Sequence, residues 1–373
     1  MRRIYIYELR DWPQFGWSAE RVAGPLASAR HRQGRLIGRM EGLGFDLQQE
    51  AVLRTLTADV VRSSEIEGQT LDARQVRSSI ARRLGMDIGG LTRADRNVEG
   101  VVEMMLDATR HFDQPLTSER LFAWRASLFP TGRSGMTKIR TGAWRDDSAS
   151  AMQVVSGPIG RERVHFEAPK ADRVAGEMDA FLNWFEDKQP IDPVLKAGLA
   201  HLWFVTVHPF EDGNGRIARA IADMALARSE NSPQSFYTLS AQIRQERNGY
   251  YEILERTQKG RLDVTLWIEW FLGCLGRAID GAQEALSAVL EKARFWERIR
   301  NVPLNERQRS IVNRLLDGLE GKLTSSKYAT LAKCSQDTAH RDILYLVEHR
   351  VLVRNPEGGR STSYSLAPPK QRG

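Results

Sequence analysis

Two apolar segments with helical periodicity are joined by the dodecapeptide His208-Pro209-Phe210-Glu211-Asp212-Gly213-Asn214-Gly215-Arg216-Ile217-Ala218-Arg219. Pro209 predicts that the first helix ends at His208, because proline disfavours helical geometry in the residue before it. Gly213 and Gly215 allow the backbone to curl tightly, so that successive N–H groups point into one concavity. That concavity adjoins the N-terminus of the next helix, whose unpaired N–H groups and dipole attract anions. The turn therefore predicts an anion-binding site.

Four side chains of the turn add the chemistry of a nucleotide phosphate site. Arg216 and Arg219 lie three residues apart on the first helical turn, so both can face one anion as bidentate donors. Asp212 adds a hard oxygen suited to Mg²⁺, which binds through one or two carboxylates together with substrate phosphates. His208 is the side chain here that exchanges a proton near pH 7. The alternative is a glycine-rich turn between helices with its arginines in solvent, but the convergence of these groups favours nucleotide chemistry.

The whole chain has the composition of a globular protein. Its 373 residues predict two to three domains, and its 41% apolar and 27% charged residues exclude disordered, collagen-like and coiled-coil classes. The best candidate for a membrane span, residues 266–279, is shorter than the roughly 20 apolar residues required and contains Glu269 and Arg277. Cys274 and Cys334 have no metal-ligand spacing and allow no disulfide framework. We therefore expect a cytoplasmic protein that does not bind membranes.

Apolar periodicity predicts an all-α protein with one β-hairpin in its middle. Helices are expected at residues 18–40, 47–67, 72–84, 93–110, 118–126, 171–185, 192–207, after 215, at 241–257 and at 264–299. The glycine-rich region 138–167 is expected to hold a hairpin built from residues 142–145 and 152–155. The expected domains are a helical N-terminal domain at 1–92, a domain carrying the phosphate turn at 93–300 and a small basic domain at 303–367.

The phosphate turn resembles the Fic motif, HPFx[DE]GNGRxxR, at every specified position. The resemblance covers roughly residues 121–271 and includes the Gly-x-Trp-Arg segment at 142–145. It implies a helical bundle with a β-hairpin flap and a protein adenylyltransferase, which transfers AMP from ATP to a Ser, Thr or Tyr hydroxyl of a protein substrate. Mg²⁺ would be required. The related Doc type, which transfers phosphate instead, has a different motif tail.

The resemblance assigns a role to each polar residue of the motif. His208 would deprotonate the target hydroxyl, and Asp212 would hold Mg²⁺. The Gly213–Gly215 backbone and the Asn214 side chain would bind the α- and β-phosphates. Arg216 would contact the β-phosphate, and Arg219 would contact the γ-phosphate. Target chains in the family add as a strand to the flap edge, which implies docking at Met152, Gln153, Val154 and Val155. The alternative is that this strand only packs on the bundle. Family adenosine contacts fall on Asn248 and Tyr251, although Tyr251 could equally belong to the core.

A carboxylate ends the apolar stripe of the helix at 47–67. Leu53, Leu56, Val60, Ser63 and Glu67 follow helical spacing and share one face. A buried carboxylate is expensive unless it is paired, so periodicity alone leaves two readings, a paired Glu67 or one that frays into solvent.

The resemblance favours the paired reading. Ser63-x-x-x-Glu67-Gly68 is similar to the family's inhibitory motif, [ST]xxxE[GN], whose glutamate pairs with the second motif arginine. Glu67 would thus pair with Arg219 and occupy the place of the γ-phosphate, which implies autoinhibition. In some relatives the same glutamate also supports removal of AMP, so a bifunctional enzyme is a further alternative.

The last fifth of the chain is basic, with 12 Lys and Arg against 7 Asp and Glu in residues 303–373. Its pattern of three helices and a two-stranded hairpin resembles a winged helix-turn-helix. If this module binds DNA, Gln336, His340 and Arg341 face the major groove, while Arg354 and Arg360 contact phosphates. Dimer contacts or protein docking are the alternative.

Two function classes remain at the level of sequence. The first is an autoinhibited adenylyltransferase, and the second is a winged-helix regulator whose Fic core senses nucleotide. A pure sensor has no need of a base, so the intact His208, Asp212 and Arg219 favour the enzyme. ATP and a protein substrate are the expected partners, with DNA and a homodimer as further candidates.

Overall fold

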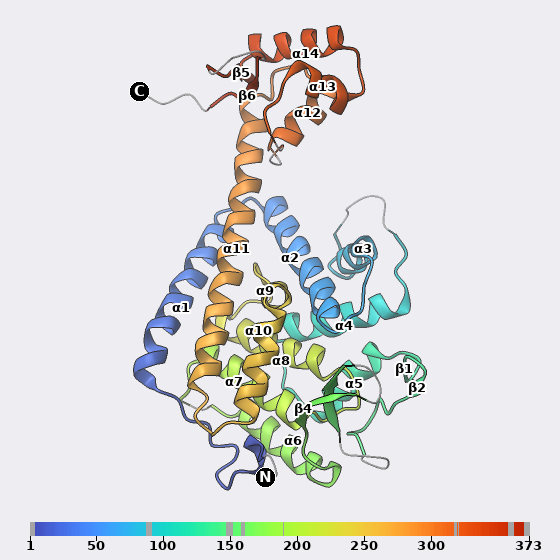
Figure 1. The fold of residues 1–373 in the computed structure, drawn as a ribbon, viewed down its shortest axis with the longest axis vertical. Helices are drawn as coiled ribbons and strands as arrows, with labels where there is room; N and C mark the ends of the chain where they lie inside the picture. Colours follow the sequence, from blue (N-terminus) through green and yellow to red (C-terminus); the bar gives the residue numbers. More distant parts are fainter. Residues whose placement is uncertain are drawn as a thin grey trace. The chain divides into compact units, whose positions relative to one another are not determined.

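The computed structural model describes residues 4–86, 92–146, 152–157, 161–188, 190–316, 319, 321–356 and 362–368. Contacts divide the chain into two compact units, Met1–Glu284 and Ala285–Gly373, and the division falls inside one long helix, α11 (Thr265–Arg298). The first unit contains the helical region expected at 1–92 together with most of the region expected at 93–300. The expected all-helical class is confirmed (Figure 1).

Helices make up most of the first unit. Before α11 they are η1 (Ile6–Glu8), α1 (Ala19–Glu41), α2 (Phe45–Ile66), α3 (Ala73–Arg83), α4 (Arg96–Arg110), α5 (Ser118–Leu128), α6 (Ala171–Glu186), α7 (Pro193–Val207), α8 (Asn214–Glu230), α9 (Leu239–Gln245) and α10 (Arg247–Gln258). Polar N-caps begin several of them: Ser18, Asp72, Asp95 and Thr117 each accept an N–H from the first turn. Gly68 and Gly85, with φ of 78° and 68°, follow α2 and α3.

Helices α7 and α8 lie side by side and position the phosphate turn between them (Figure 1). All but one of the side chains after Pro193 in α7 are buried, as expected for a helix that is apolar all round. The helix begins at Pro193, behind Asp192, whose carboxylate accepts the Val194 N–H at 2.8 Å. α2, α4, α5 and α9 also contact α8. The turn is therefore anchored to the most heavily packed part of the unit.

The expected hairpin exists, but the prediction of its first strand was wrong. β3 (Gln153–Ser156) pairs with β4 (Arg163–Glu167), and residues 142–145 form a loop instead. Their side chains serve as anchors: the Trp144 ring centroid lies 4.6 Å from that of Phe122, and Arg145 is buried against backbone carbonyls. Trp144 is half-buried and the adjacent Arg145 is buried, so these consecutive side chains do not show the alternation that a strand requires.

Two further details differ from the sequence prediction. Two-residue strands β1 (Arg133–Ser134) and β2 (Thr137–Lys138) form an additional hairpin. The helix expected at 241–257 is two helices, because the chain leaves helical geometry at Glu246 between α9 and α10. The Glu246 carboxylate accepts hydrogen bonds from Arg277 of α11 at 2.5 and 2.6 Å. This ion pair holds the residue between α9 and α10 against α11.

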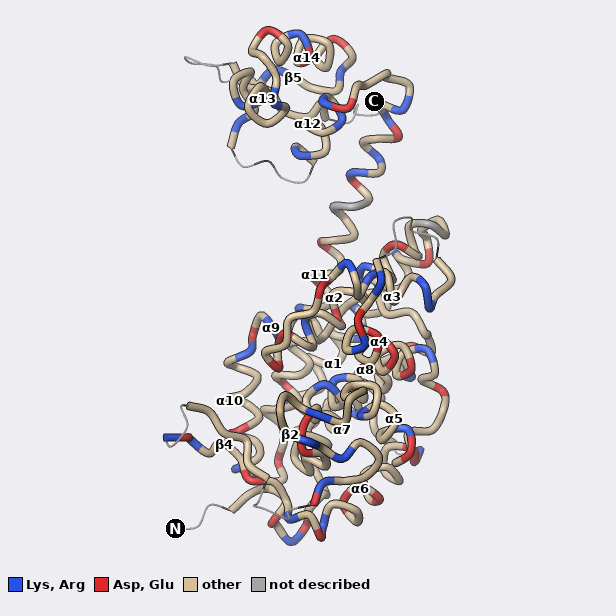
Figure 2. Tube along the Cα trace, turned by 90° about the vertical axis from the view of Figure 1, so that its right-hand side faces the viewer, with Lys and Arg blue, Asp and Glu red and all other residues tan. Residues whose placement is uncertain are grey.

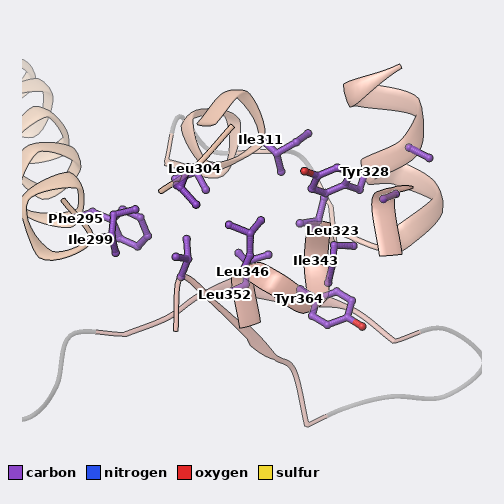
Figure 3. Close-up of a cluster of buried hydrophobic side chains, with 14 residues drawn as sticks. Phe295, Ile299, Leu304, Ile311, Leu323, Tyr328, Ile343, Leu346, Leu352 and Tyr364 are labelled. Atoms are coloured by element: carbon purple, nitrogen blue, oxygen red, sulfur yellow. The ribbon is translucent and has the colours of Figure 1, made fainter. Parts of the chain in front are cut away.

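The second unit has the order of elements expected for the C-terminal module. It comprises α12 (Glu306–Leu316), α13 (Ser325–Ala332), α14 (Gln336–Glu348) and the antiparallel strands β5 (Leu352–Arg354) and β6 (Tyr364–Leu366). Figure 3 shows Leu304, Ile311, Leu346 and Leu352, which come from different segments, pointing into one apolar cluster. This unit therefore has a core of its own. Its likeness to a winged helix stays a prediction.

Charged residues are spread over both units, with acidic and basic positions interspersed (Figure 2). Some of them join separate helices of the first unit, such as Arg21 with Glu269 at 2.5 Å and Arg30 with Asp192 at 2.9 Å. None of the helices within the described ranges has the length and apolar content that a bilayer crossing needs.

Leu346→Ala is expected to destabilise the second unit by about 2–5 kcal/mol, because it opens a cavity at a fully buried position. Leu344→Ala is the matched control on the same helix, since Leu344 is 51% exposed, and it should stay within about 0.5 kcal/mol of the parent. Hydrogen exchange of amides in α12 and α14, followed by mass spectrometry of the full chain, measures both. Equal exchange in the two variants would contradict the shared core.

Candidate functional site

The phosphate turn has the curled backbone expected from its glycines. His208 ends α7 in the left-handed region, with φ of 52°, and Gly213 has φ of 85°. The Asn214 amide fastens the curl, because its Oδ1 accepts the Phe210 N–H at 3.0 Å and its Nδ2 donates to the Phe210 carbonyl at 2.7 Å. Both ends of this amide are thus engaged within the turn. The Asn214 side chain thus holds the shape of the loop, and its contact with phosphate stays a prediction.

Two buried arginines that lie outside the motif hold the turn from behind. Arg125 of α5 donates to the Asp212 carbonyl and pairs with the Glu211 carboxylate. Arg145 donates through its side-chain Nε to the His208 carbonyl at 2.8 Å, and its backbone N–H donates to the Pro209 carbonyl at 2.9 Å. Each arginine satisfies carbonyls that a tight turn leaves without helical partners. The turn is therefore a preorganised element.

Asp212 has the free oxygen lone pairs that a hard cation requires. Its Oδ1 accepts the Gly213 N–H at 2.5 Å, and its Oδ2 accepts the Ser134 hydroxyl from the β1–β2 hairpin. These two contacts orient the carboxylate without neutralising it, whereas the neighbouring Glu211 carboxylate is paired with Arg125. Within the described ranges, no group of three or more His, Cys, Asp or Glu could hold a metal ion. A single carboxylate supplemented by substrate phosphates fits Mg²⁺.

Arg219 is a deeply enclosed charge of the site, with a 1% exposed side chain. Its Nε donates to the Ser63 hydroxyl and its Nη2 to the Ser63 carbonyl, both at 2.9 Å. Nη2 also pairs with Glu67 Oε1 at 2.8 Å. Burial opposes the charge, but Glu67, together with Tyr250 and Tyr251, outweighs burial and raises the pKa of Arg219. The structure thus contains the Glu67–Arg219 pair, and α2 presents both Ser63 and Glu67 to α8.

The Glu67 carboxylate stands over the N-terminus of α8. A Cβ placed on Gly215 would lie 2.1 Å from Glu67 Oε1, so only glycine leaves room for the carboxylate there. An anion at this position benefits from the unpaired N–H groups and the dipole of the helix. A side-chain carboxylate therefore occupies the kind of site that the sequence assigned to a phosphate.

Arg216 is also held by the segment that follows α2. Its Nη1 donates to Gln69 Oε1 at 2.8 Å, and its guanidinium lies over the Phe129 ring, 5.1 Å from the centroid. The Nε of Arg216 is buried without a hydrogen-bond partner in the described part of the chain. Such an unsatisfied charged donor is costly. An incoming anion would satisfy it.

A cavity of about 610 Å³ brings together the predicted groups. Its walls include His208, Asp212 and Gly213–Gly215 of the turn, Asn248 and Tyr251 of α10, Met152–Val155 of the flap, and Glu67. Arg216 and Arg219 are not among its described lining residues, because Glu67 and Gln69 cover their charged ends. The geometry therefore offers a site of nucleotide size whose two arginines are occupied.

His208 is half-buried at the wall of this cavity. Its Nδ1 lies 3.3 Å from the Val205 carbonyl, which can only accept, so the ring proton belongs on Nδ1 and Nε2 is the basic nitrogen. Burial lowers the pKa of His208 to about 4 despite the neighbouring Val205 carbonyl, Glu67 and Asp212. The imidazole is therefore neutral at pH 7, the state in which it can accept a proton.

The flap strand has one free edge among the described residues, because the only partner of β3 there is β4. Val155 on β3 is 49% exposed, which leaves the expected docking strand accessible. In the second unit, Gln336, His340 and Arg341 are exposed on α14, and Arg354 is exposed on β5. The predicted phosphate contact Arg360 lies outside the described residues.

Sequence reasoning missed four residues of the site: Arg125, Ser134, Arg145 and Gln69. Arg125 and Ser134 have no local signal, since their partners are 78 or more residues away along the chain. Arg145 belongs to the segment that was assigned to a strand. Gln69 directly follows the inhibitory motif, so its position next to Glu67 was the signal available.

Two family models match the chain. The Fic/DOC family model matches residues 115–226, which include the phosphate turn, and a domain of unknown function, DUF4172, matches residues 5–86, which include Glu67. The protein adenylyltransferase Fic of Nematostella vectensis is 35% identical over 114 residues, or 30% of this chain and 25% of that protein. The Aedes aegypti protein of the same name is 31% identical over 105 residues, or 28% of this chain and 19% of that protein. The chain thus aligns with about a quarter or less of these relatives.

Solved structures resemble the chain over a longer stretch. A Fic family protein from Desulfovibrio desulfuricans is 23% identical, with a TM-score of 0.53, covering 96% of this chain and 99% of that one. A Fic domain containing signaling protein from Bacteroides thetaiotaomicron is 19% identical, with a TM-score of 0.50, covering 72% of this chain and 97% of that one. These likenesses concern the fold. The Fic/DOC family model, which matches residues 115–226 with the intact motif, marks this part of the chain as a Fic/DOC domain.

Proposed function

We propose that this protein transfers AMP from ATP to hydroxyl side chains of protein targets. The observation that carries the proposal is the cavity in which a neutral His208, the Asp212 carboxylate and the N-terminus of α8 meet. Anion-binding N–H groups, a base and a hard-cation ligand are the parts that nucleotide transfer requires. The names of the similar relatives support the same reaction class.

In the proposed reaction, His208 Nε2 takes the proton of the target hydroxyl. The hydroxyl oxygen forms a bond to the α-phosphorus, the bond from that phosphorus to the bridging oxygen of the β-phosphate breaks, and pyrophosphate leaves. The Gly213–Gly215 backbone binds the phosphates, and Arg216 and Arg219 contribute positive charge. Asn214 keeps these N–H groups in place through its bonds to Phe210. Preorganised donors of this kind stabilise charge that develops in the transition state.

Asp212 is the residue that would hold Mg²⁺, and the ion would neutralise phosphate charge when bound. Hydrogen bonds from the Ser134 hydroxyl and the Gly213 N–H hold the Asp212 carboxylate in place in the wall of the cavity. Asn248 and Tyr251 line the same cavity, which supports their assignment to the adenosine end of the nucleotide. An extended target chain would add to the free edge of β3.

Glu67 is proposed to restrain this activity. One guanidinium cannot pair with a buried carboxylate and a γ-phosphate at the same time, and Nη2 of Arg219 is already 2.8 Å from Glu67. The carboxylate also occupies the space above Gly215. Transfer would therefore require α2 to release Arg219.

Glu67→Gly is expected to raise AMP incorporation at least tenfold, because it frees Arg219 and the space over Gly215. Labelled ATP with Mg²⁺ measures incorporation into the protein itself and into added protein. Glu65→Gly is the matched control, because it makes the same substitution two residues away. The carboxylate that it removes pairs with Arg62 and not with Arg219. Equal incorporation by the parent, Glu67→Gly and Glu65→Gly would remove the inhibitory role.

His208→Ala in the Glu67→Gly background is expected to lower transfer by about 10²–10⁴-fold, the usual contribution of a general base. ATP binding, measured by calorimetry, should change little, since the phosphates are bound by the turn backbone and arginines. His111→Ala serves as the control, because the side chain of His111 is 65% exposed and pairs only with Asp107 of its own helix among the described contacts. A His208→Ala protein with parental rate would refute the assignment of the base.

DNA binding by the second unit is a second candidate function. The observation that favours it is the exposed set Gln336, His340 and Arg341 on α14, with Arg354 exposed on β5. An exposed helix of this composition, followed by a hairpin, suits a major groove with phosphate contacts beside it.

Arg341→Ala is expected to weaken DNA binding by the full-length protein at least fivefold in a gel shift at low salt, because it removes a guanidinium from the exposed face of α14. Affinity of the parent should fall as salt rises, since bound counterions are released. Leu344→Ala is the control, because Leu344 is exposed on the same helix and carries no charge. Absence of a shift at low salt would favour protein docking instead.

A further inference from the structure

A serine, a histidine and a glutamate form a continuous chain of hydrogen bonds beside the flap. Ser156 Oγ of β3 lies 2.5 Å from His165 Nε2 of β4, and His165 Nδ1 lies 2.6 Å from Glu255 Oε2 of α10. None of the three belongs to the Fic motif or to the inhibitory motif. All three line the 610 Å³ cavity that also contains His208.

The backbone of the flap aims the imidazole at this position. Val154 pairs with Phe166 and Val155 with Val164, so His165 is an extra residue with no partner opposite it on β3. An extra residue of this kind is a β-bulge, which re-aims a side chain and recurs next to active sites. The bulge thus directs His165 toward both Ser156 and α10.

The charge of Glu255 determines which nitrogen of His165 is basic. Burial raises the pKa of this carboxyl, but hydrogen bonds from Lys259, His165 and Arg163 outweigh burial and lower the pKa to about 2. An ionised carboxylate only accepts hydrogen bonds, so the ring proton lies on Nδ1. In the neutral ring His165 Nε2 is therefore an acceptor, and the Ser156 hydroxyl donates to it. A hydroxyl held by an imidazole that a carboxylate orients is the arrangement of an activated oxygen nucleophile.

We propose that Ser156 is an internal acceptor, so that the protein modifies its own flap with a nucleotide bound in the same cavity. The inference rests on the proposed function, because it uses the same reaction and the same ATP. Ser156 is exposed to the cavity, and the strand that carries it borders the expected target-docking residues Met152–Val155. A hydroxyl anchored in the cavity wall reacts with the advantage of proximity over a free target.

The proposed step balances without a further reactant. His165 Nε2 takes the Ser156 proton, the bond from Ser156 Oγ to the α-phosphorus forms, the bond from that phosphorus to the bridging oxygen breaks, and pyrophosphate leaves. Afterwards Ser156 carries a phosphodiester-linked AMP at the edge where a target strand would bind. Modified protein is therefore expected to accept protein targets less well than unmodified protein.

The test uses the full-length Glu67→Gly protein incubated with ATP and Mg²⁺. After tryptic digestion, fragmentation of the peptide of residues 146–161 should place AMP on Ser156 and not on Ser148 or Ser150, which the same peptide contains. The fraction modified per minute should not depend on protein concentration, because the reaction is internal. Ser156→Thr should retain modification at residue 156, and His165→Gln should slow it at least tenfold. Hydrogen exchange of the β3–β4 peptides checks that His165→Gln keeps the hairpin folded.

Each result bears on the inference or on its foundation. AMP on other residues with Ser156 unmodified would overturn the inference and leave the proposed function standing, and the chain Ser156–His165–Glu255 would then only fasten the flap to α10. Modification of Ser156 that grows with protein concentration would also overturn it, since the acceptor would be external. No AMP on any residue, together with no pyrophosphate release in the presence of added proteins, would overturn the proposed function itself.

Discussion

A single buried guanidinium constrains the rest of the structure. Arg219 is buried, so its guanidinium is costly unless an anion compensates its charge. Helix α2 supplies three acceptors for it, the Ser63 hydroxyl, the Ser63 carbonyl and the Glu67 carboxylate. The same three contacts fasten α2 to α8. Because α2 and Glu67 cover the charged end of Arg219, the position of α2 determines whether another anion can reach this guanidinium.

The N-terminal part of the chain touches the site at a second place. Tyr5, which precedes η1, and Tyr7, which lies within it, stack with ring centroids 5.9 Å apart, and both pack edge-to-face with Phe166 on β4. Met152 and Val154 of the flap region pack on the same aromatic cluster. The segment matched by DUF4172 thus supports the flap through its first residues and covers Arg219 through α2. One continuous segment contacts both the strand proposed to dock targets and the arginine proposed to bind ATP.

The sequence predicts features of the structure that depend on neighbouring residues, and it fails for features that contacts with distant residues determine. Gly213 and Gly215 predict the curl of the turn, and the spacing from Leu53 to Glu67 predicts the buried face of α2. Both features follow from local geometry. The strand predicted at 142–145 is a loop, because Trp144 packs on Phe122 and Phe210 and Arg145 donates to the His208 carbonyl. Phe210 and His208 lie more than 60 residues further along the chain, where local sequence patterns give no signal. The Asn214 amide binds the backbone of Phe210, and its contact with phosphate stays a prediction. A motif identifies a side chain but not whether that side chain serves the ligand or the loop.

The environment of Arg219 also explains why release of Glu67 need not unfold the site. Asp59 of α2, which is buried, and Asp223 of α8, which is half-buried, lie near this arginine, and burial together with Asp59 raises the pKa of Asp223 well above its usual range. The charge of Arg219 favours the ionised form of both carboxyls, against the effect of burial. Together with the two Ser63 oxygens, these carboxyls would stay beside Arg219 if Glu67 departed. The guanidinium would then keep polar partners while it exchanges a carboxylate for a phosphate, which is the electrostatic condition for the proposed reversible restraint.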